Sequence, residues 1–93
     1  MTAALFELGR TVATPGALRT MTQIGINVAS LLERHASGDF GDLTADDLHA
    51  NMDALSGDDP ARVFSVYRFP SVTLWCITEW DRSVTTLLLP EEY

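Results

Sequence analysis

The side chains with the most reactive chemistry gather in one short segment, Thr78-Glu79-Trp80-Asp81-Arg82-Ser83, with Thr85 close behind it. The Arg82 guanidinium could clamp a phosphate or carboxylate, and Glu79 could serve as a general base beside it. The same residues have a structural interpretation, in which Asp81 builds a tight turn and Arg82 pairs with Glu79 across it. Both interpretations are open from the sequence, and the segment is a candidate ligand or partner site.

A second polar group is expected where a helix end meets the first strand of a sheet. Arg34 and His35 close a predicted helix, while Arg62 and Tyr67 lie in a predicted strand with Ser65 between them. If the helix packs on the sheet, these side chains would form a small pocket able to bind an anion. The alternative is that His35 stabilises the C-terminus of its helix through the dipole and that Arg62 is a solvated strand end.

Metal binding and thiol chemistry are not expected. His35 and Asp39, followed by Asp42, could approach a divalent ion, but the spacing matches neither a zinc motif nor the alternating oxygen ligands of an EF-hand. Cys76 is the single cysteine, so no internal disulfide can form. It lies in an apolar run beside Trp75, a setting that predicts a buried, unreactive thiol. We therefore expect no metal and no cofactor.

The charge of the chain disfavours one class of partner and favours another. The chain contains thirteen acidic residues and six basic residues, and all six are arginine, so its formal net charge is −7. Residues 36–61 contain seven aspartates and no lysine or arginine. Because non-specific nucleic-acid binding depends on a basic surface that neutralises phosphates, direct nucleic-acid binding is not expected. The acidic segment favours a partner protein with a basic surface, although aspartates in such a run also act as helix caps and as a solvated face.

The length and composition indicate one small globular domain over residues 1–93, of which 46% are hydrophobic. The apolar runs are far shorter than the ~20 residues of a membrane span, so we expect no association with a membrane. The single thiol and the lack of a recognisable signal peptide predict a cytoplasmic protein.

Three helices are predicted from side chains that can cap a helix N-terminus. Threonine and asparagine oxygens accept a hydrogen bond from a backbone N–H of the first turn, and proline is favoured at the first helical position. In the third predicted helix, Leu48, Met52 and Leu55 recur at helical spacing and lie on one apolar stripe. The capping residues are Thr14, Asn27 and Thr44, and the helices that they begin cover about residues 15–25, 28–36 and 45–55.

The period of the apolar residues changes from about 3.6 to 2 after Pro60, which indicates strands. Three strands are predicted, over residues 62–68, 72–78 and 84–89, with short connections that favour an antiparallel meander. Helices followed by strands predict an α+β fold, in which N-terminal helical segments pack on a three-stranded antiparallel meander sheet. Residues 1–12 are ambiguous between a helical turn and a short strand.

The second predicted strand is apolar on both faces, because Val72, Leu74 and Cys76 alternate with Trp75 and Ile77. Helices can cover one face of a small sheet, and leaving the other face wet would expose a large apolar patch. An antiparallel edge strand can also pair with a copy of itself. We therefore expect self-association, most simply as a homodimer.

Nearly the whole chain resembles a family of small bacterial proteins of mobile elements, often labelled plasmid-related protein and sometimes type I restriction methylase subunit. The matching pattern comprises Leu8-Gly9, Val12-Ala13-Thr14-Pro15-Gly16-Ala17-Leu18, Leu32-Glu33-Arg34-His35, Gly38-Asp39-Phe40-Gly41-Asp42-Leu43, Arg62, Ser65, Tyr67, Ile77-Thr78-Glu79, Asp81-Arg82-Ser83, Thr85-Thr86 and Leu88-Leu89-Pro90-Glu91-Glu92-Tyr93. The chain departs from it at Phe40, where the family has Trp, and at Trp80, where it has a small residue. The resemblance implies carriage on plasmids, phages or integrated elements, and it implies no catalytic mechanism. The methylase label lacks physical support, because no glycine-rich nucleotide loop follows a strand.

Two functions of different classes follow. The first is a non-enzymatic accessory protein of a bacterial mobile element that binds another protein, such as one that handles nucleic acid in a restriction or CRISPR system. The alternative is a small enzyme, or a binder of a phosphorylated or carboxylated ligand, that uses the turn containing Glu79 and Arg82. The alternative requires the candidate groups to converge in a concave pocket instead of spending their hydrogen bonds on one another.

Overall fold

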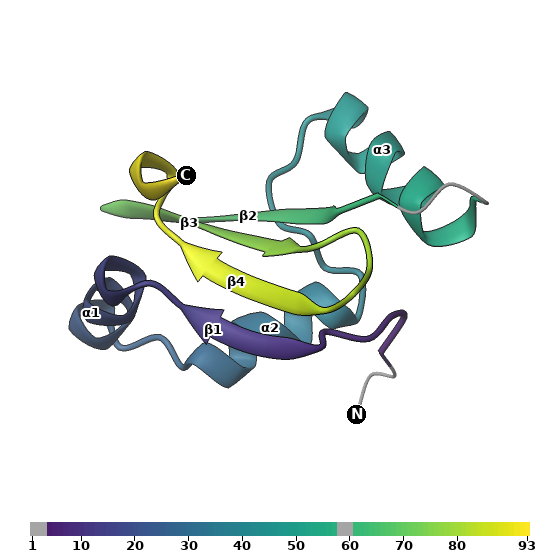
Figure 1. Ribbon diagram of the computed structural model, residues 1–93. Coiled ribbons are helices and arrows are strands. Elements are labelled where there is room, and N and C mark those ends of the chain that lie inside the picture. The colour runs from purple at the N-terminus through teal and green to yellow at the C-terminus, as the bar shows by residue number, and fades with distance from the viewer. Residues whose placement is uncertain (1–3, 58–60) are drawn as a thin grey trace.

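The computed structural model describes residues 4–57 and 61–93. Over these residues the protein has an α+β fold with three α-helices and a four-stranded mixed sheet. Figure 1 shows α1 and α2 together on one side of the sheet, with α3 apart from them beside β2. In chain order the elements are β1 (Arg10–Ala13), α1 (Pro15–Ile24), α2 (Val28–Ala36), α3 (Ala45–Ser56), β2 (Val63–Phe69), β3 (Val72–Thr78), β4 (Val84–Leu88) and a C-terminal 3-10 helix, η1 (Pro90–Glu92).

All three helices begin at the capping residues that the sequence predicts. The Ala17 N–H donates to Thr14 Oγ1 at 3.1 Å, and the Ala29 N–H donates to the Asn27 side chain at 2.8 Å. Thr44 accepts in the same way from the Asp47 N–H, at 3.1 Å. Each bond satisfies one of the first-turn N–H groups that a helix leaves without a partner. These caps depend on residues two or three positions apart, so the sequence alone locates them.

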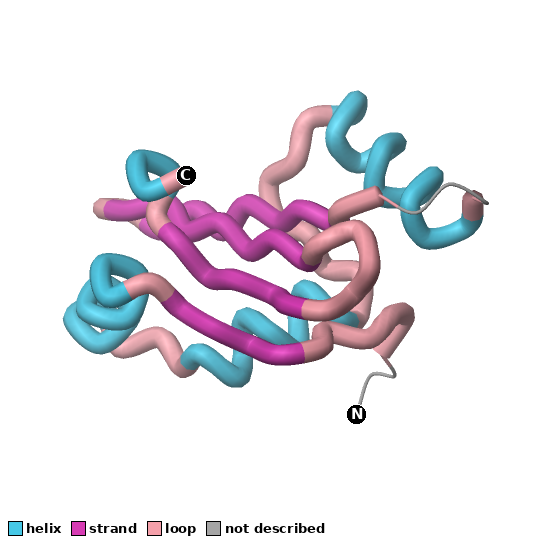
Figure 2. The backbone as a smooth tube through the Cα atoms, viewed as in Figure 1, coloured by secondary structure: helices cyan, strands magenta, loops and turns pink. Residues whose placement is uncertain are grey.

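The sheet has one strand more than the predicted three-stranded meander. Its order is β1-β4-β3-β2, and β1 pairs parallel to β4, with Arg10 opposite Val84 and Ala13 opposite Leu87 (Figure 2). The prediction of a purely antiparallel sheet is therefore wrong in its fourth strand, while the β2-β3-β4 meander is confirmed. Strand β1 is only four residues long, and its partner lies at the other end of the chain, so no local pattern announces it.

Gly9 makes the approach of β1 to β4 possible. Its φ is +65°, in the left-handed region, and a Cβ atom at this position would lie 2.5 Å from the Ser83 carbonyl oxygen. Only glycine fits both the conformation and the space. The next residue, Arg10, then donates its N–H to that same carbonyl at 2.9 Å and begins the parallel ladder.

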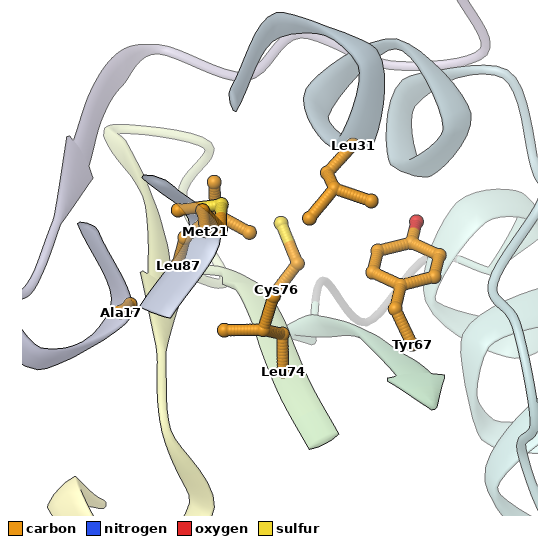
Figure 3. Packing of buried hydrophobic residues seen from close by; sticks show 7 residues of the cluster. All are labelled: Ala17, Met21, Leu31, Tyr67, Leu74, Cys76 and Leu87. Carbon is orange, nitrogen blue, oxygen red and sulfur yellow. The ribbon is translucent and has the colours of Figure 1, made fainter. Parts of the chain in front are cut away.

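The main core lies between the sheet and the layer formed by α1 and α2. Figure 3 shows its seven fully buried residues, contributed by both helices and by β2, β3 and β4. Cys76 belongs to this cluster, and burial raises the pKa of its thiol, in agreement with the prediction of a buried, unreactive cysteine. The cluster consists of Ala17, Met21, Leu31, Tyr67, Leu74, Cys76 and Leu87.

Helix α3 buries only part of its predicted apolar stripe. Leu55 is partly buried and packs against the cluster of Phe40, Ala54 and Val63. The side chains of Leu48 and Met52 are 45% and 43% exposed, and the buried residues of the helix are Asn51 and Ala54. The amide of Asn51 hydrogen-bonds the backbone of Phe64, which is on β2. Since this polar contact sets the rotation of α3, the apolar pair is turned away from the sheet.

The two edges of the sheet differ in how well they are covered. Along β2, the Val66 N–H donates to the Phe40 carbonyl at 3.0 Å, and the Val66 carbonyl accepts from the Asp42 N–H at 2.8 Å. Together with Asn51, these bonds occupy most of the outward backbone groups of β2. The other edge is β1.

Among the described residues, no helix has the length and apolar character that crossing a membrane would require.

Candidate functional site

His35 on α2 is the centre of a buried chain of hydrogen bonds that joins five parts of the fold. Its Nδ1 lies 2.5 Å from Ser65 Oγ on β2, and its Nε2 lies 2.9 Å from Thr78 Oγ1 on β3. Thr78 in turn lies 2.6 Å from Thr85 Oγ1 on β4, its cross-strand partner. The chain ends where the Thr85 hydroxyl donates to the Leu8 carbonyl at 2.7 Å, in the segment before β1.

The end of this chain fixes the direction of every bond in it. Because the Leu8 carbonyl can only accept, the single hydroxyl proton of Thr85 is used there, and Thr85 must accept from Thr78. Thr78 then accepts from an N–H at His35 Nε2, which leaves Nδ1 to accept from Ser65 in the neutral imidazole. Burial favours this form, because it lowers the pKa of His35 to about 4.

A serine hydroxyl bonded to an imidazole is the arrangement of an activated nucleophile, but this pair has no access to a substrate. His35 and Ser65 are both fully buried, and the edges of Phe6 and Phe40 approach the imidazole at 5.3 and 6.1 Å between ring centres. The prediction that the His35 side chain caps the end of its helix is also wrong, since both ring nitrogens bond to the sheet. The network is a structural element that ties α2 to the sheet.

Arg82 is a structural clip. Its Nη1 donates to the carbonyls of Ala61, Glu79 and Trp80 at 2.7, 3.1 and 3.3 Å, and its Nη2 donates to the Ala54 carbonyl at 3.2 Å. The guanidinium thus links the last turn of α3, the segment before β2 and the β3–β4 turn. It does so from a backbone φ of +60°, which is uncommon for a residue with a side chain.

The β3–β4 turn supports the structural interpretation of its residues, with one correction. Asp81 accepts from the Ser83 N–H at 3.0 Å, and its hydrogen bonds to Ser83 lower the pKa of its carboxyl. In the part of the chain that the structure describes, the ion pairs are Arg34–Asp39 and His49–Asp53, so the expected pairing of Arg82 with the Glu79 carboxylate is absent. Trp80 is 59% exposed and does not pack over the turn.

The predicted pocket at the end of α2 forms only in part. Arg34 binds Asp39 through Nε at 2.7 Å, and its guanidinium stacks 4.5 Å from the centre of the Tyr67 ring. The hydrogen bond from Arg34 holds the pKa of Asp39 below its usual value, and the Tyr67 hydroxyl donates to the Asp39 carbonyl at 2.8 Å. Arg62 points elsewhere and donates to the Tyr93 hydroxyl. The candidate residues therefore do not converge on one anion site.

A groove lies on the sheet face that α1 and α2 leave uncovered. Its floor is formed by Phe64 and Trp75, whose rings meet edge to face at 5.1 Å, and it encloses a cavity of about 370 Å³. Asp42 and Asp47 line it together with Arg68, so acidic and basic groups both border the cavity. The groove has aromatic surface but no convergent set of reactive groups.

The outer side of α3 is the second exposed feature. Leu48 and Met52, four residues apart, form an apolar stripe on its surface, which we name the α3 stripe. Asp46, Asp47 and Asp53 lie on the same helix, and α3 contains no lysine or arginine. The sequence does signal this stripe, through its i, i+4 spacing, but the spacing alone does not distinguish a core face from a free one.

Comparison with known families, curated proteins and solved structures finds no significant match to this chain. The resemblance to the plasmid-related family therefore stays a prediction.

Proposed function

We propose that the protein acts by binding another protein and has no catalytic activity of its own. The observation that carries the proposal is the α3 stripe. Full burial of a leucine or methionine side chain is worth about 1.5–3 kcal/mol, so each of these half-exposed residues forgoes on the order of 1 kcal/mol in the isolated chain. A partner that covers both recovers that free energy, which is the physical basis of an interaction surface.

Among the described residues, the groups on which the enzyme alternative depends are already occupied. The imidazole of His35 is buried and bonded at both nitrogens, and the Arg82 guanidinium spends its donors on backbone carbonyls. Because the Arg82 guanidinium bonds these carbonyls, it is not available to bind an anion beside Glu79. A ligand-binding turn would need these side chains to be unpaired and directed into a cavity.

The biological setting of the proposal comes from the sequence resemblance. It implies an accessory protein of a bacterial mobile element, which we propose acts in the cytoplasm on a host or element protein. The seven aspartates between residues 36 and 61 favour a partner with a basic surface and disfavour direct binding to nucleic acid.

The test is affinity capture from the native host with three versions of the tagged chain. Leu48→Gln combined with Met52→Gln removes the stripe and keeps a good helix former at both positions. Leu18→Gln on α1 is the matched control, because Leu18 is 48% exposed and Leu48 is 45% exposed. We expect one partner to co-purify with the wild type and the control at equal yield and to be lost with the double variant. Equal recovery with all three versions, or no specific partner with any, would contradict the proposal.

A further inference from the structure

We infer that the α3 stripe receives an amphipathic helix of the partner protein, with an apolar ridge flanked by lysine or arginine. The inference rests on the proposed function and adds the chemistry and shape of the segment that is recognised. Three features of α3 support it: the geometry of the stripe, the charge around it, and the way the helix is attached to the rest of the fold.

The geometry of the stripe favours a helix as its occupant. Leu48 and Met52 are separated by four residues, or about 6 Å along a helix axis, and form part of an i±4 ridge. Such ridges pack into the grooves of a second helix. The backbone N–H and C=O groups in the middle of α3 are bonded within the helix, so an extended strand would find no ladder partners there.

The negative charge of α3 favours a partner helix with positive charge. Asp46, Asp47 and Asp53 are exposed and have no basic neighbour on the helix, apart from the weakly paired His49, whose Nε2 lies 3.4 Å from Asp53. A second copy of α3 laid against the first would bring Asp47 and Asp53, which flank the stripe about 100° around the helix axis, near their counterparts, and this disfavours self-association through this surface. A basic helix gains attraction at the same positions.

The attachment of α3 leaves the stripe available. The helix is held by Asn51 and Ala54 on its inner face and by the Arg82 bond to the Ala54 carbonyl near its C-terminal end. These contacts are on the side facing β2, and none of them involves Leu48 or Met52. A partner can therefore cover the stripe without displacing a contact of the fold.

The experiment uses three synthetic peptides of equal length and the purified full chain. The first is an amphipathic helix with leucine at the ridge positions and lysine at the others. The second replaces each lysine by glutamate, and the third keeps the lysine and leucine composition in scrambled order. Binding is measured by fluorescence anisotropy of the labelled peptides, and the site is mapped by amide chemical-shift changes.

We expect the basic amphipathic peptide to bind at least about tenfold more tightly than either of the others, with shift changes centred on α3. Leu48→Gln combined with Met52→Gln should weaken it by at least about tenfold, whereas Leu18→Gln should leave it unchanged. Equal binding of the scrambled peptide, or no effect of the double variant, would overturn the inference. If the native partner is captured through the stripe but the basic peptide does not bind, the inference fails while the proposed function stands. If the capture and the peptide binding both fail, the proposed function and the inference are both wrong.

Discussion

Asn51 and Phe64 exchange two hydrogen bonds that imitate a pair of residues in a β-ladder. The Asn51 Nδ2 donates to the Phe64 carbonyl at 2.7 Å, and the Phe64 N–H donates to Asn51 Oδ1 at 3.0 Å. The side-chain amide presents its donor and acceptor to the edge of β2 as a neighbouring strand would. One residue thereby orients α3 and closes part of an exposed sheet edge.

We predict that Asn51→Ala lowers the free energy of unfolding by on the order of 2 kcal/mol, because two backbone groups of β2 lose their partner. Urea denaturation followed by circular dichroism measures the change. His49→Ala, an exposed position on the same helix, is the control and should change it by no more than about 0.5 kcal/mol. Equal stability of the two variants would show that the edge bonds contribute little.

We predict that stability falls on acidification because of His35. Its pKa is lowered to about 4 in the folded state, against about 6.5 in an unfolded chain, so the unfolded state binds the proton first. Full stability is present above about pH 6.5 and is lost between that pH and about pH 4. The loss should be on the order of 1 kcal/mol at pH 5.5 and on the order of 3 kcal/mol by pH 4.

Urea denaturation at pH 7.5, 6.5 and 5.5 measures this slope. The net charge of −7 works in the opposite direction, since acidification relieves repulsion between carboxylates. The slope should persist in His49→Gln, whose imidazole is exposed, and disappear in His35→Gln. An unchanged slope in His35→Gln would assign the effect to another group.

We predict that Arg82→Ala lowers the free energy of unfolding by on the order of 3 kcal/mol. Four carbonyls lose a charged donor, and alanine is strained at a φ of +60°. Arg82→Gly loses the same bonds without the strain, so it should be about 1 kcal/mol more stable than Arg82→Ala. Chemical denaturation of both variants separates the two effects. A melting temperature of Arg82→Ala within about two degrees of the wild type would show that the hydrogen bonds of Arg82 contribute little to stability.

We predict a homodimer formed by pairing of β1 with its copy, because β1 is an edge strand of the sheet. The N–H groups of Arg10 and Thr14 bond to β4, and strand alternation directs that of Thr11 outward. Thr11→Pro removes this outward donor without breaking the ladder to β4. Light scattering should give twice the mass of one chain for the wild type and a single chain for Thr11→Pro. A monomeric wild type at micromolar concentration would contradict the prediction.

The sequence predicts what depends on near neighbours. The three caps and the β2-β3-β4 meander follow from residues a few positions apart, and the Asp81 turn bonds Ser83, two residues away. Residues 1–12 stay ambiguous from the sequence, and strand β1 with its parallel pairing is not predicted, since that pairing with β4 spans almost the whole chain. Its identity depends on Gly9 and on a partner that no local window contains.

The roles of single polar residues were harder to predict for the same reason. The sequence indicates His35 and Arg82 as candidate site residues, but their hydrogen-bond partners are hydroxyls and backbone carbonyls on distant elements. Because every residue has a backbone carbonyl, the sequence does not show which one Arg82 will bond. The sequence gives only one sign of the role of Asn51, which is a polar residue beside the predicted apolar stripe of α3. Because Asn51 bonds the edge of β2, Leu48 and Met52 of the predicted stripe are exposed, while Leu55 packs against the second core cluster.

The bond from Thr85 to Leu8 spans 77 positions of the chain, and it has a consequence for how the protein folds. Strand β4 comes last of the four strands in the chain but lies between β3 and β1 in the sheet, so it must insert between two earlier strands. Until β4 inserts, one side of β3 has no backbone partner, and Thr78 and His35 lack the end of their hydrogen-bond chain. Any folding intermediate that lacks β4 would therefore expose the inner edge of β3, and we expect such a species to be prone to aggregation.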